Sequence, residues 1–154
     1  MTERFRAAFD GGARGNPGAA AWGVVVLAAD GSPLEGHAGL LGSTTNNVAE
    51  YNGLIEALKL AAGAGAAQVE IITDSELIAR QIEGRYRVKN PGLKPLFAEA
   101  KRLIAGFALF RIRHVRREEN KEADRLVNKA LNLAEAGGGD VRLRESYESE
   151  PAGG

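Results

Sequence analysis

The sequence predicts an α/β domain in which a five-stranded mixed sheet is flanked by helices, in the order βββαβααβα. Two apolar segments, residues 21–29 and 33–41, are separated by Asp30, Gly31 and Ser32, a pattern typical of a β-hairpin. Farther along the chain, short apolar segments alternate with segments whose apolar residues recur at helical spacing. An antiparallel meander followed by alternating strands and helices indicates a mixed sheet with helices packed on it.

The first half of the chain is expected to hold three strands and a helix. Residues 5–9 form a short apolar strand that should end at Asp10, because the following GGARGNPG has neither strand nor helix period. The two segments of the hairpin supply the next strands. From Val48 to Ala62 apolar residues recur at helical spacing, and the glycines that follow predict the end of this helix.

The second half alternates between strands and helices. A buried-type strand ending at Asp74 is followed by two helices, a strand and a last helix, expected at residues 69–73, 75–84, 93–104, 107–115 and 123–134. The glycines and the acidic end that follow predict a mobile tail over residues 137–154, although residues 141–143 are apolar enough to dock locally. Residues 1–136 are therefore expected to form one domain.

Composition limits the chemistry that is available. The chain of 154 residues is long enough for one domain, and it has no cysteine, so a metal would be held by oxygen or histidine ligands and hard cations fit best. No segment reaches the ~18 apolar residues of a membrane span, and the charged start lacks the apolar core of a secretory signal. We expect a cytoplasmic protein that does not contact a membrane.

Charge is unevenly distributed, although the net charge is zero. Residues 85–117 contain ten Lys or Arg against one acid, Glu99, which gives 10 − 1 = +9. A basic stretch beside an acidic cluster suits a substrate whose phosphates are held on one surface while metal ions neutralise carboxylates at the reacting bond. The alternative interpretation is a solvated basic helix and strand.

Four carboxylates lie at the ends of predicted elements: Asp10, Glu50, Asp74 and Asp124. Such positions can meet at one edge of a sheet, where carboxylates could hold two divalent cations for in-line attack on a phosphodiester. Asp10 is expected to bridge the two ions, because a strand end beside glycines leaves space for metals and for the substrate backbone. Glu50 and Asp74 would complete one metal site, and Asp124 would belong to the other.

Each carboxylate also has a purely structural interpretation. Glu50 has the spacing of a capping box with Asn47, and Asp74 could cap the helix that follows it. Asp124 could merely favour a helix N-terminus, and Asp10 could be a turn residue. These interpretations explain each residue separately, but not why all four coincide with one set of motifs.

Those motifs are FDGGARGNPG around Asp10, TNNVAEYNGLIEAL around Glu50, ITDSELI around Asp74 and ENKEADRLVNKAL around Asp124. In this order, over residues 5–134, they resemble type 1 ribonuclease H. The resemblance implies a ribonuclease H-like fold and endonucleolytic cleavage of the RNA strand in an RNA/DNA hybrid, with two Mg²⁺ or Mn²⁺ ions per site, leaving 3′-hydroxyl and 5′-phosphate ends. Glu50 would also accept a hydrogen bond from a ribose 2′-hydroxyl.

The same resemblance implies the substrate contacts. Asn16, Asn46 and Asn47 match positions that touch the minor groove, where the 2′-hydroxyl distinguishes RNA from DNA. Asn16 could instead serve only the Asn-Pro-Gly turn. Thr45 and Asn90 match a pocket that grips a phosphate of the DNA strand.

One departure from the best-known bacterial form concerns substrate binding. The stretch between Asp74 and Asn90 is too short for the extra helix and loop that form a basic hybrid-binding handle in that form. Only Arg85, Arg87 and Lys89 remain as partial substitutes. Weaker hybrid binding is therefore expected.

A second departure concerns a flexible histidine that, in the best-known bacterial form, lies in a loop before the last motif and is thought to assist product release. His114 has the matching ten-residue separation from the last motif's aspartate, but we interpret it as a structural residue that ends a strand, alternates with Phe110 and Ile112, and points with the sheet rather than into solvent. Arg117 is the candidate for the auxiliary role, with Arg116 behind it. As a cation it could bind the scissile phosphate or help the product leave, but it could not act as a general base at neutral pH. Its alternative is a solvated loop arginine.

Two rival functions remain open. One is a related metal nuclease that also cuts double-stranded RNA, and the other is a non-catalytic module that binds hybrids. A non-catalytic module would be expected to have lost one of the four carboxylates, and all four are present. The expected partner is an RNA/DNA hybrid, and a monomer that requires no protein partner is expected.

Overall fold

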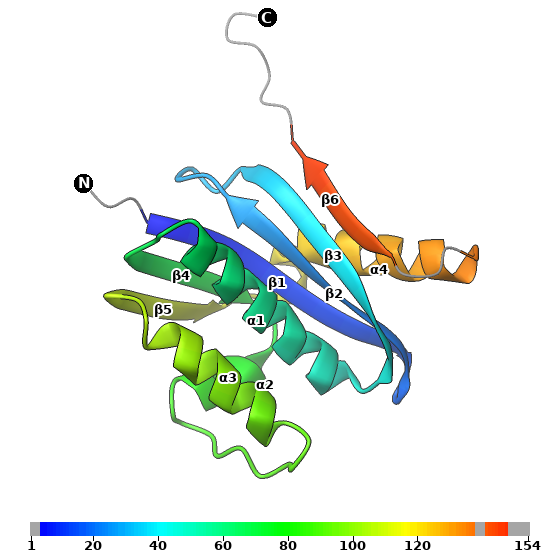
Figure 1. The fold of residues 1–154 in the computed structure, drawn as a ribbon, viewed down its shortest axis with the longest axis horizontal. Coiled ribbons are helices and arrows are strands. Elements are labelled where there is room, and N and C mark those ends of the chain that lie inside the picture. The colour runs from blue at the N-terminus through cyan, green and yellow to red at the C-terminus, as the bar shows by residue number, and fades with distance from the viewer. Residues whose placement is uncertain (1–3, 138–140, 148–154) are drawn as a thin grey trace, which may run out of the picture.

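A six-stranded mixed sheet with helices on both faces forms the body of the protein (Figure 1). The structure is a computed structural model that describes residues 4–137 and 141–147. The strands lie in the order β5-β4-β1-β2-β3-β6. Strands β1, β2 and β3 form an antiparallel meander, and β4 and β5 run parallel to β1. The predicted fold class is thus confirmed, with one strand more than expected.

The observed elements follow the predicted order up to the last helix, and a strand is added after it. A short 3₁₀ helix, Arg117–Glu119, precedes the last α-helix. The bounds are β1 (Arg4–Gly15), β2 (Gly18–Leu27), β3 (Pro33–Thr44), α1 (Asn46–Gly63), β4 (Gln68–Thr73), α2 (Glu76–Ile82), α3 (Lys94–Ile104), β5 (Leu109–His114), α4 (Lys121–Glu135) and β6 (Arg142–Ser146).

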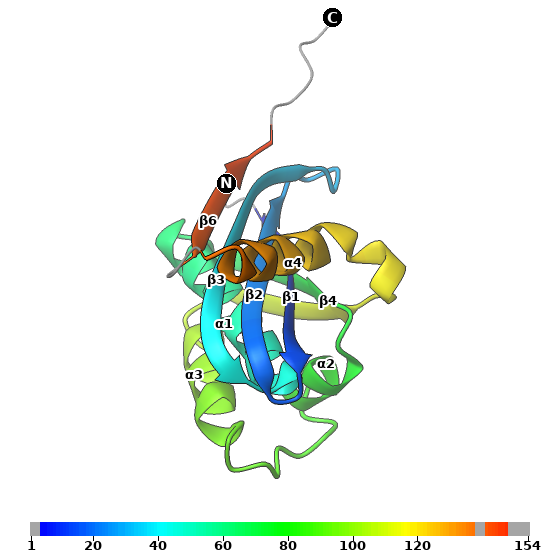
Figure 2. The same cartoon turned by 90° about the vertical axis from the view of Figure 1, so that its right-hand side faces the viewer.

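Helices lie on both faces of the sheet (Figure 2), and an apolar cluster on each face packs them against it. On one face, α1 packs on β1 and β2, with α2 and α3 beside it, around a cluster that includes Phe9, Tyr51 and Leu58. On the other face, α4 packs on β1, β2 and β3 through Leu126 and Val127. Within the described part of the chain, no helix is both long and apolar enough to cross a membrane.

Strand β1 does not end at Asp10, as the sequence suggested. It continues through the glycine-rich segment to Gly15 and pairs with β2 in an unbroken register from Arg6↔Leu27 to Gly15↔Gly18. Glycines carry no side chain to reveal a strand period, so the segment resembled a turn in the sequence. Gly11 does not open space for substrate either, because a Cβ there would lie 2.2 Å from the carbonyl carbon of Ala49 in α1. Because Gly11 has no side chain, α1 can pack closely against β1 at this point.

The predicted tail over residues 137–154 is wrong for Arg142–Ser146, which form β6 antiparallel to β3. This strand makes the sheet six-stranded. Leu143 packs on the apolar cluster under α4, and Glu145 binds the side chains of Arg125 and Lys129 on that helix. The remainder of the predicted tail, residues 138–140 and 148–154, lies outside the described residues.

Candidate metal centre

Three of the predicted carboxylates come together at the sheet. Oxygen atoms of Asp10, Glu50 and Asp74 all lie within 4.8 Å of one another. The parallel pairing of β1 with β4 extends to Phe9↔Thr73. Asp10 is the next residue in β1, and Asp74 is the residue that follows β4, so the two lie side by side. The close approach of α1 to Gly11 places Glu50 against the same point. Backbone packing therefore builds this cluster, which we call the carboxylate triad.

Neither Glu50 nor Asp74 serves as a helix cap. Helix α1 is capped by Thr45, whose hydroxyl accepts a hydrogen bond from the Val48 amide at 3.2 Å, two residues earlier than the capping-box interpretation required. Helix α2 is capped by Ser75, whose hydroxyl accepts from the Ile78 amide at 3.2 Å. The interpretations of Glu50 and Asp74 as helix-capping residues are both excluded.

Burial and mutual repulsion raise the pKa values in the triad. Burial raises the pKa of Asp10 from 3.8 to about 8, and the charge of Asp74 adds to this, followed by Asp124 and Glu50. Burial likewise raises the pKa of Glu50 from 4.5 to about 7, opposed by a hydrogen bond from the Ser75 hydroxyl. Carboxylates held in this way are poised to accept positive charge.

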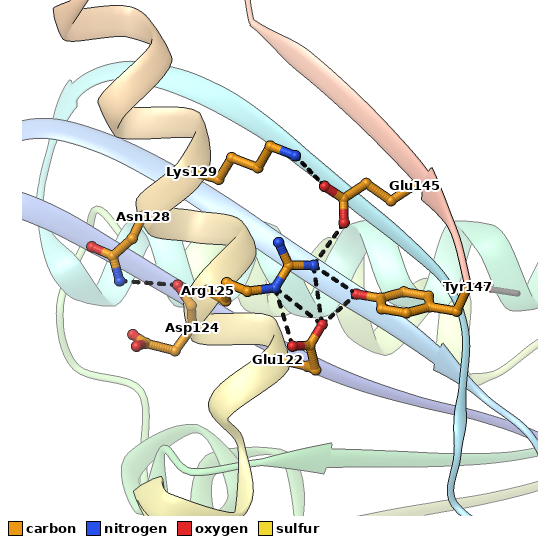
Figure 3. A network of polar contacts seen from close by, with 7 residues as sticks. All are labelled: Glu122, Asp124, Arg125, Asn128, Lys129, Glu145 and Tyr147. Carbon is orange, nitrogen blue, oxygen red and sulfur yellow. Dashed lines mark hydrogen bonds and ion pairs between the residues drawn. The ribbon is translucent and has the colours of Figure 1, made fainter.

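Asp124 stands outside the triad but within its electrostatic reach. It lies in the first turn of α4, and its side chain is exposed. Its charge contributes to the raised pKa of Asp10. In Figure 3 its carboxylate points away from the Arg125 network on the same helix. Among the four predicted carboxylates, the structure thus clusters three and places the fourth nearby.

The donor set fits hard divalent cations. All four groups are carboxylates, the ligands that Mg²⁺ and Mn²⁺ prefer, and three of them converge within a span that one ion could bridge. The raised pKa values of Asp10 and Glu50 measure a repulsion that a bound cation would relieve. The described residues therefore support metal binding at this point.

Asn120 is a site residue that the sequence analysis did not single out. It is 3% exposed, and its Nδ2 donates to the carbonyl oxygen of Phe9 at 2.8 Å and to Oδ2 of Asp74 at 3.4 Å. Its Oδ1 is buried without a hydrogen-bond partner among the described residues. Its only sequence signal is its place four residues before Asp124, where an asparagine suggests a helix cap, but its side chain makes no capping bond. It ties β1 to Asp74.

The polar residues assigned to substrate binding surround the start of α1. Asn16 Oδ1 accepts from the Asn46 amide at 3.1 Å, and Asn46 Oδ1 accepts from the Ala13 amide at 2.8 Å. These bonds join the β1–β2 turn to the helix and leave both side-chain amide groups without a partner among the described residues. Asn47 is half-buried beside them.

Asn90 lies elsewhere on the chain, in the connection before α3. Its Oδ1 accepts from the Gly92 amide at 2.7 Å, and its carbonyl oxygen accepts from the Leu93 and Lys94 amides. The residue is exposed. It therefore forms the turn that starts α3, and its side-chain amide group faces no partner among the described residues.

Arg117 and His114 differ in their relation to the triad. Arg117 begins the 3₁₀ helix, is exposed, and lies close enough to Glu50 for its charge to oppose the rise in the pKa of that carboxyl. His114 ends β5 as predicted, but its side chain is exposed, so the interpretation that it points away from solvent is wrong. At the end of an edge strand, the alternation with Phe110 and Ile112 does not bury the last residue.

The sequence matches a family described as reverse transcriptase-like over residues 8–130. Ribonuclease HI of Halobacterium salinarum is 41% identical over 131 residues, which cover 85% of this chain and 66% of that protein. The bifunctional protein Rv2228c of Mycobacterium tuberculosis is 43% identical over 126 residues, but the chain spans only 35% of its length.

Solved structures share the fold. The crystal structure of RNase H1 from Halobacterium salinarum superposes with a TM-score of 0.81 at 41% identity, covering 84% of this chain and 98% of that one. The N-terminal RNase H domain of Rv2228c gives 0.83 at 40% identity, covering 89% and 99%. LC11-RNase H1, solved in complex with an RNA/DNA hybrid, gives 0.80 at 42% identity, covering 84% and 98%.

Proposed function

The chain belongs to the type 1 ribonuclease H family, and on this premise we propose that it is an endonuclease that hydrolyses the RNA strand of RNA/DNA hybrids, leaving 3′-hydroxyl and 5′-phosphate ends. The observation that carries the proposal is the carboxylate triad of Asp10, Glu50 and Asp74 with Asp124 beside it. A fold shared with a protein that was solved bound to a hybrid supports the substrate class.

The four carboxylates would hold two Mg²⁺ or Mn²⁺ ions. When bound, such ions lower the pKa of water and neutralise charge on the leaving 3′-oxygen of a phosphodiester. Asp10, whose pKa responds to the charges of all three other carboxylates, would bridge the two ions, with Glu50 and Asp74 completing one site and Asp124 the other. Asn120 would keep the Asp74 carboxylate oriented through its hydrogen bond.

Recognition of RNA would rest on neutral polar groups. The side-chain amide groups of Asn16 and Asn46 have no partner among the described residues, so they are available to acceptors in the minor groove. Asn47 would join them, and Glu50 would accept a hydrogen bond from a 2′-hydroxyl. Thr45 keeps a hydroxyl proton to donate to a phosphate while its oxygen caps α1.

Two residues farther from the triad complete the proposed site. Asn90 would add a side-chain amide group to the grip on a DNA-strand phosphate. Arg117 would bind the scissile phosphate or assist release of the product, a role that its charge near Glu50 supports. It would not transfer a proton at neutral pH.

The connection between α2 and α3 is short, so we propose that the protein binds hybrids more weakly than forms with a basic handle. Arg85, Arg87 and Lys89 in this connection are exposed and would supply partial substitutes. We further propose that the protein acts in the cytoplasm as a monomer and requires no protein partner to cleave its substrate.

A substrate panel tests the proposed specificity. An RNA/DNA hybrid, an RNA duplex and a DNA duplex of one sequence, each end-labelled, are incubated with Mg²⁺ and, separately, Mn²⁺. Internal cutting of only the RNA strand of the hybrid, with 5′-phosphate products, is the expected result. Equal cutting of the RNA duplex would favour the broader nuclease. Tight hybrid binding without any cutting would favour the binding module.

A further inference from the structure

An open cavity of about 1240 Å³ lies at the end of the sheet where β1, β4 and β5 begin. Its wall includes Arg4, Arg6, Arg111 and Arg113. Gln68 at the start of β4 lines the cavity, and Asp74 follows the other end of this strand, about 20 Å of extended chain from Gln68. Arg113, which pairs with Ile72, is the wall residue that lies nearest to Asp74 along the sheet. None of the four carboxylates of the candidate metal centre lines the cavity, so its wall is distinct from the carboxylate triad.

Strand register gathers the arginines on one face. Arg6 pairs with Glu70 and Glu70 with Arg111 across neighbouring strands, so the three side chains form one row. Arg4 and Arg113 each lie two residues along from a member of this row and share its face. This is the face that carries α4, but α4 packs on β1, β2 and β3 and leaves the starts of β4 and β5 open.

One buried carboxylate orients part of this basic surface. Glu70 is 6% exposed, and its Oε1 accepts from Nε of Arg6 at 2.9 Å, while Nη1 of Arg111 lies 3.9 Å from its Oε2. Arg4 and Arg113 form no ion pair with other described residues. Four guanidinium groups against one carboxylate leave three positive charges in the wall. The side chain of Arg111 is 69% exposed.

The rest of the wall is apolar. Leu34 is 50% exposed, and Leu27 and the alanines of the β2–β3 and α1–β4 connections continue the surface. Arginine forks bind carboxylates through paired hydrogen bonds, and an apolar concavity accepts an apolar side chain. We propose that this cavity is a docking site for an acidic peptide segment of a partner protein, whose carboxylates meet the arginines and whose apolar side chain lies beside Leu34.

A nucleic acid fits the cavity less well. Proteins that bind single strands stack the bases on exposed aromatic side chains. Among the described residues that line the cavity the only aromatic one is Phe5, which is half-buried and packs against the core under α1. A peptide with both acidic and apolar side chains uses the two halves of the wall, whereas a phosphate backbone uses only the arginines.

Fluorescence anisotropy with a labelled peptide, Asp-Leu-Asp-Phe-Asp-Leu-Asp, tests the proposal. The full chain should bind it in a salt-sensitive way, and the double variant Arg111→Glu/Arg113→Glu should weaken binding by roughly 10-fold or more. Leu34→Gln should weaken it several-fold. The matched control, Arg85→Glu/Arg87→Glu, reverses two exposed charges outside the cavity and should leave the affinity within about 2-fold. Thermal unfolding of each variant checks that it is folded.

Three outcomes would overturn the proposal. The first is equal binding of a peptide in which asparagine replaces every aspartate. The second is equal loss of affinity in the cavity variant and in its control. The third is displacement of the peptide from the wild type by an RNA/DNA hybrid or a single-stranded oligonucleotide, which would place the peptide on the nucleic-acid surface. Retained binding of the peptide in the presence of hybrid supports a separate site.

Discussion

At the scale of single residues, ionisation of the Asp10 carboxyl opposes folding, because the residue is buried beside other carboxylates. Its pKa of about 8 lies above the 3.8 of an unfolded chain, so the folded protein binds an additional proton between these values. Without a cation, the contribution of the Asp10 carboxyl to the stability of the fold is therefore fully present below about pH 4 and is lost as the pH rises through 8. A cation bound at the triad would relieve the repulsion that causes this loss of stability.

We predict that Asp10→Asn stabilises the metal-free protein above pH 8 by at least about 1 kcal/mol, because the amide cannot acquire the charge that burial and Asp74 oppose. The gain should vanish near pH 4. Thermal unfolding in a chelating buffer across this range measures it. Added Mg²⁺ should then stabilise the wild type more than the variant, and a variant that is less stable than the wild type at every pH would contradict the account.

Arg117 and His114 offer a second comparison of residues. Arg117→Ala should lower the turnover of hybrid roughly 10-fold, because the cation near Glu50 is lost, whereas Arg117→Lys should keep part of the activity. His114→Ala should change turnover by less than about 2-fold. Steady-state cleavage of the three variants decides the matter. A larger loss in His114→Ala than in Arg117→Ala would reverse the assignment.

At the scale of elements, the contact between β1 and α1 fixes the triad. A Cβ at Gly11 would lie 2.2–2.3 Å from backbone atoms of Ala49 and Glu50, and neither backbone can move cheaply. A Cβ at Gly12 would meet only a methyl group of Val127, at 3.6 Å. A side chain is therefore excluded at Gly11 but can be accommodated at Gly12.

Gly11→Ala should lower the free energy of unfolding by about 3 kcal/mol or more, because it forces the helix off the strand. Gly12→Ala should stay within about 1 kcal/mol of the wild type. Urea unfolding of both variants is the measurement. Similar losses in the two variants would show that β1 and α1 do not pack as described.

Strand β6 is tied to α4 by a charged network (Figure 3). Arg125 donates to Glu122, to Glu145 at 2.6 Å and to the Tyr147 hydroxyl at 3.0 Å, and Lys129 also binds Glu145. Hydrogen bonds from Arg125, and then from Lys129, lower the pKa of Glu145 from 4.5 to about 2. A depressed carboxyl pKa contributes stability above about pH 4.5, and this is lost as the pH falls through 2.

Glu145→Gln should therefore reduce stability at pH 7 by about 1 kcal/mol, since the network is largely at the surface. The difference from the wild type should shrink below pH 4.5 and disappear near pH 2. Thermal unfolding at neutral and acidic pH tests this. A difference that persists unchanged at pH 2 would mean that the lost contribution is packing rather than charge.

Sequence periodicity predicted the elements whose side chains alternate between core and solvent. It failed where side chains are missing or the segment is short: the glycines after Asp10 hid the second half of β1, and β6 in Arg142–Ser146 has a single apolar residue, Leu143. A five-residue edge strand is decided by tertiary contacts, such as those of Glu145 with α4, which no local pattern records.

At the scale of the whole molecule, the topology explains why the site was largely predictable. The sequence placed Asp10, Glu50 and Asp74 at the ends of predicted elements that could meet at one edge of a sheet, and the structure brings oxygen atoms of these three within 4.8 Å of one another. Asn120 was not predictable, because its bonds to Phe9 and Asp74 join residues 111 and 46 positions apart in the chain. The exposed position of His114 likewise depends on where the sheet ends.

The charges of the whole molecule also separate in space. Three positive charges gather in the cavity near the starts of β1, β4 and β5, while the triad lies at the other end of β4 and none of its carboxylates lines the cavity. Although the net charge of the chain is zero, its described residues form both an acidic cluster and a basic cavity wall. Substrate cleavage and partner binding are therefore expected to be separable by mutation.

The most direct test of the central claim is cleavage of an end-labelled RNA/DNA hybrid with Mg²⁺ or Mn²⁺ by the wild type, Asp74→Asn and the control Asp30→Asn. Asp30 is exposed in the β2–β3 turn, where it binds only Ser32 among the described residues. We predict metal-dependent cutting of the RNA strand that falls by roughly 100-fold or more in Asp74→Asn and is retained in Asp30→Asn. A folded wild type that binds the hybrid but cuts it with neither metal would contradict the account.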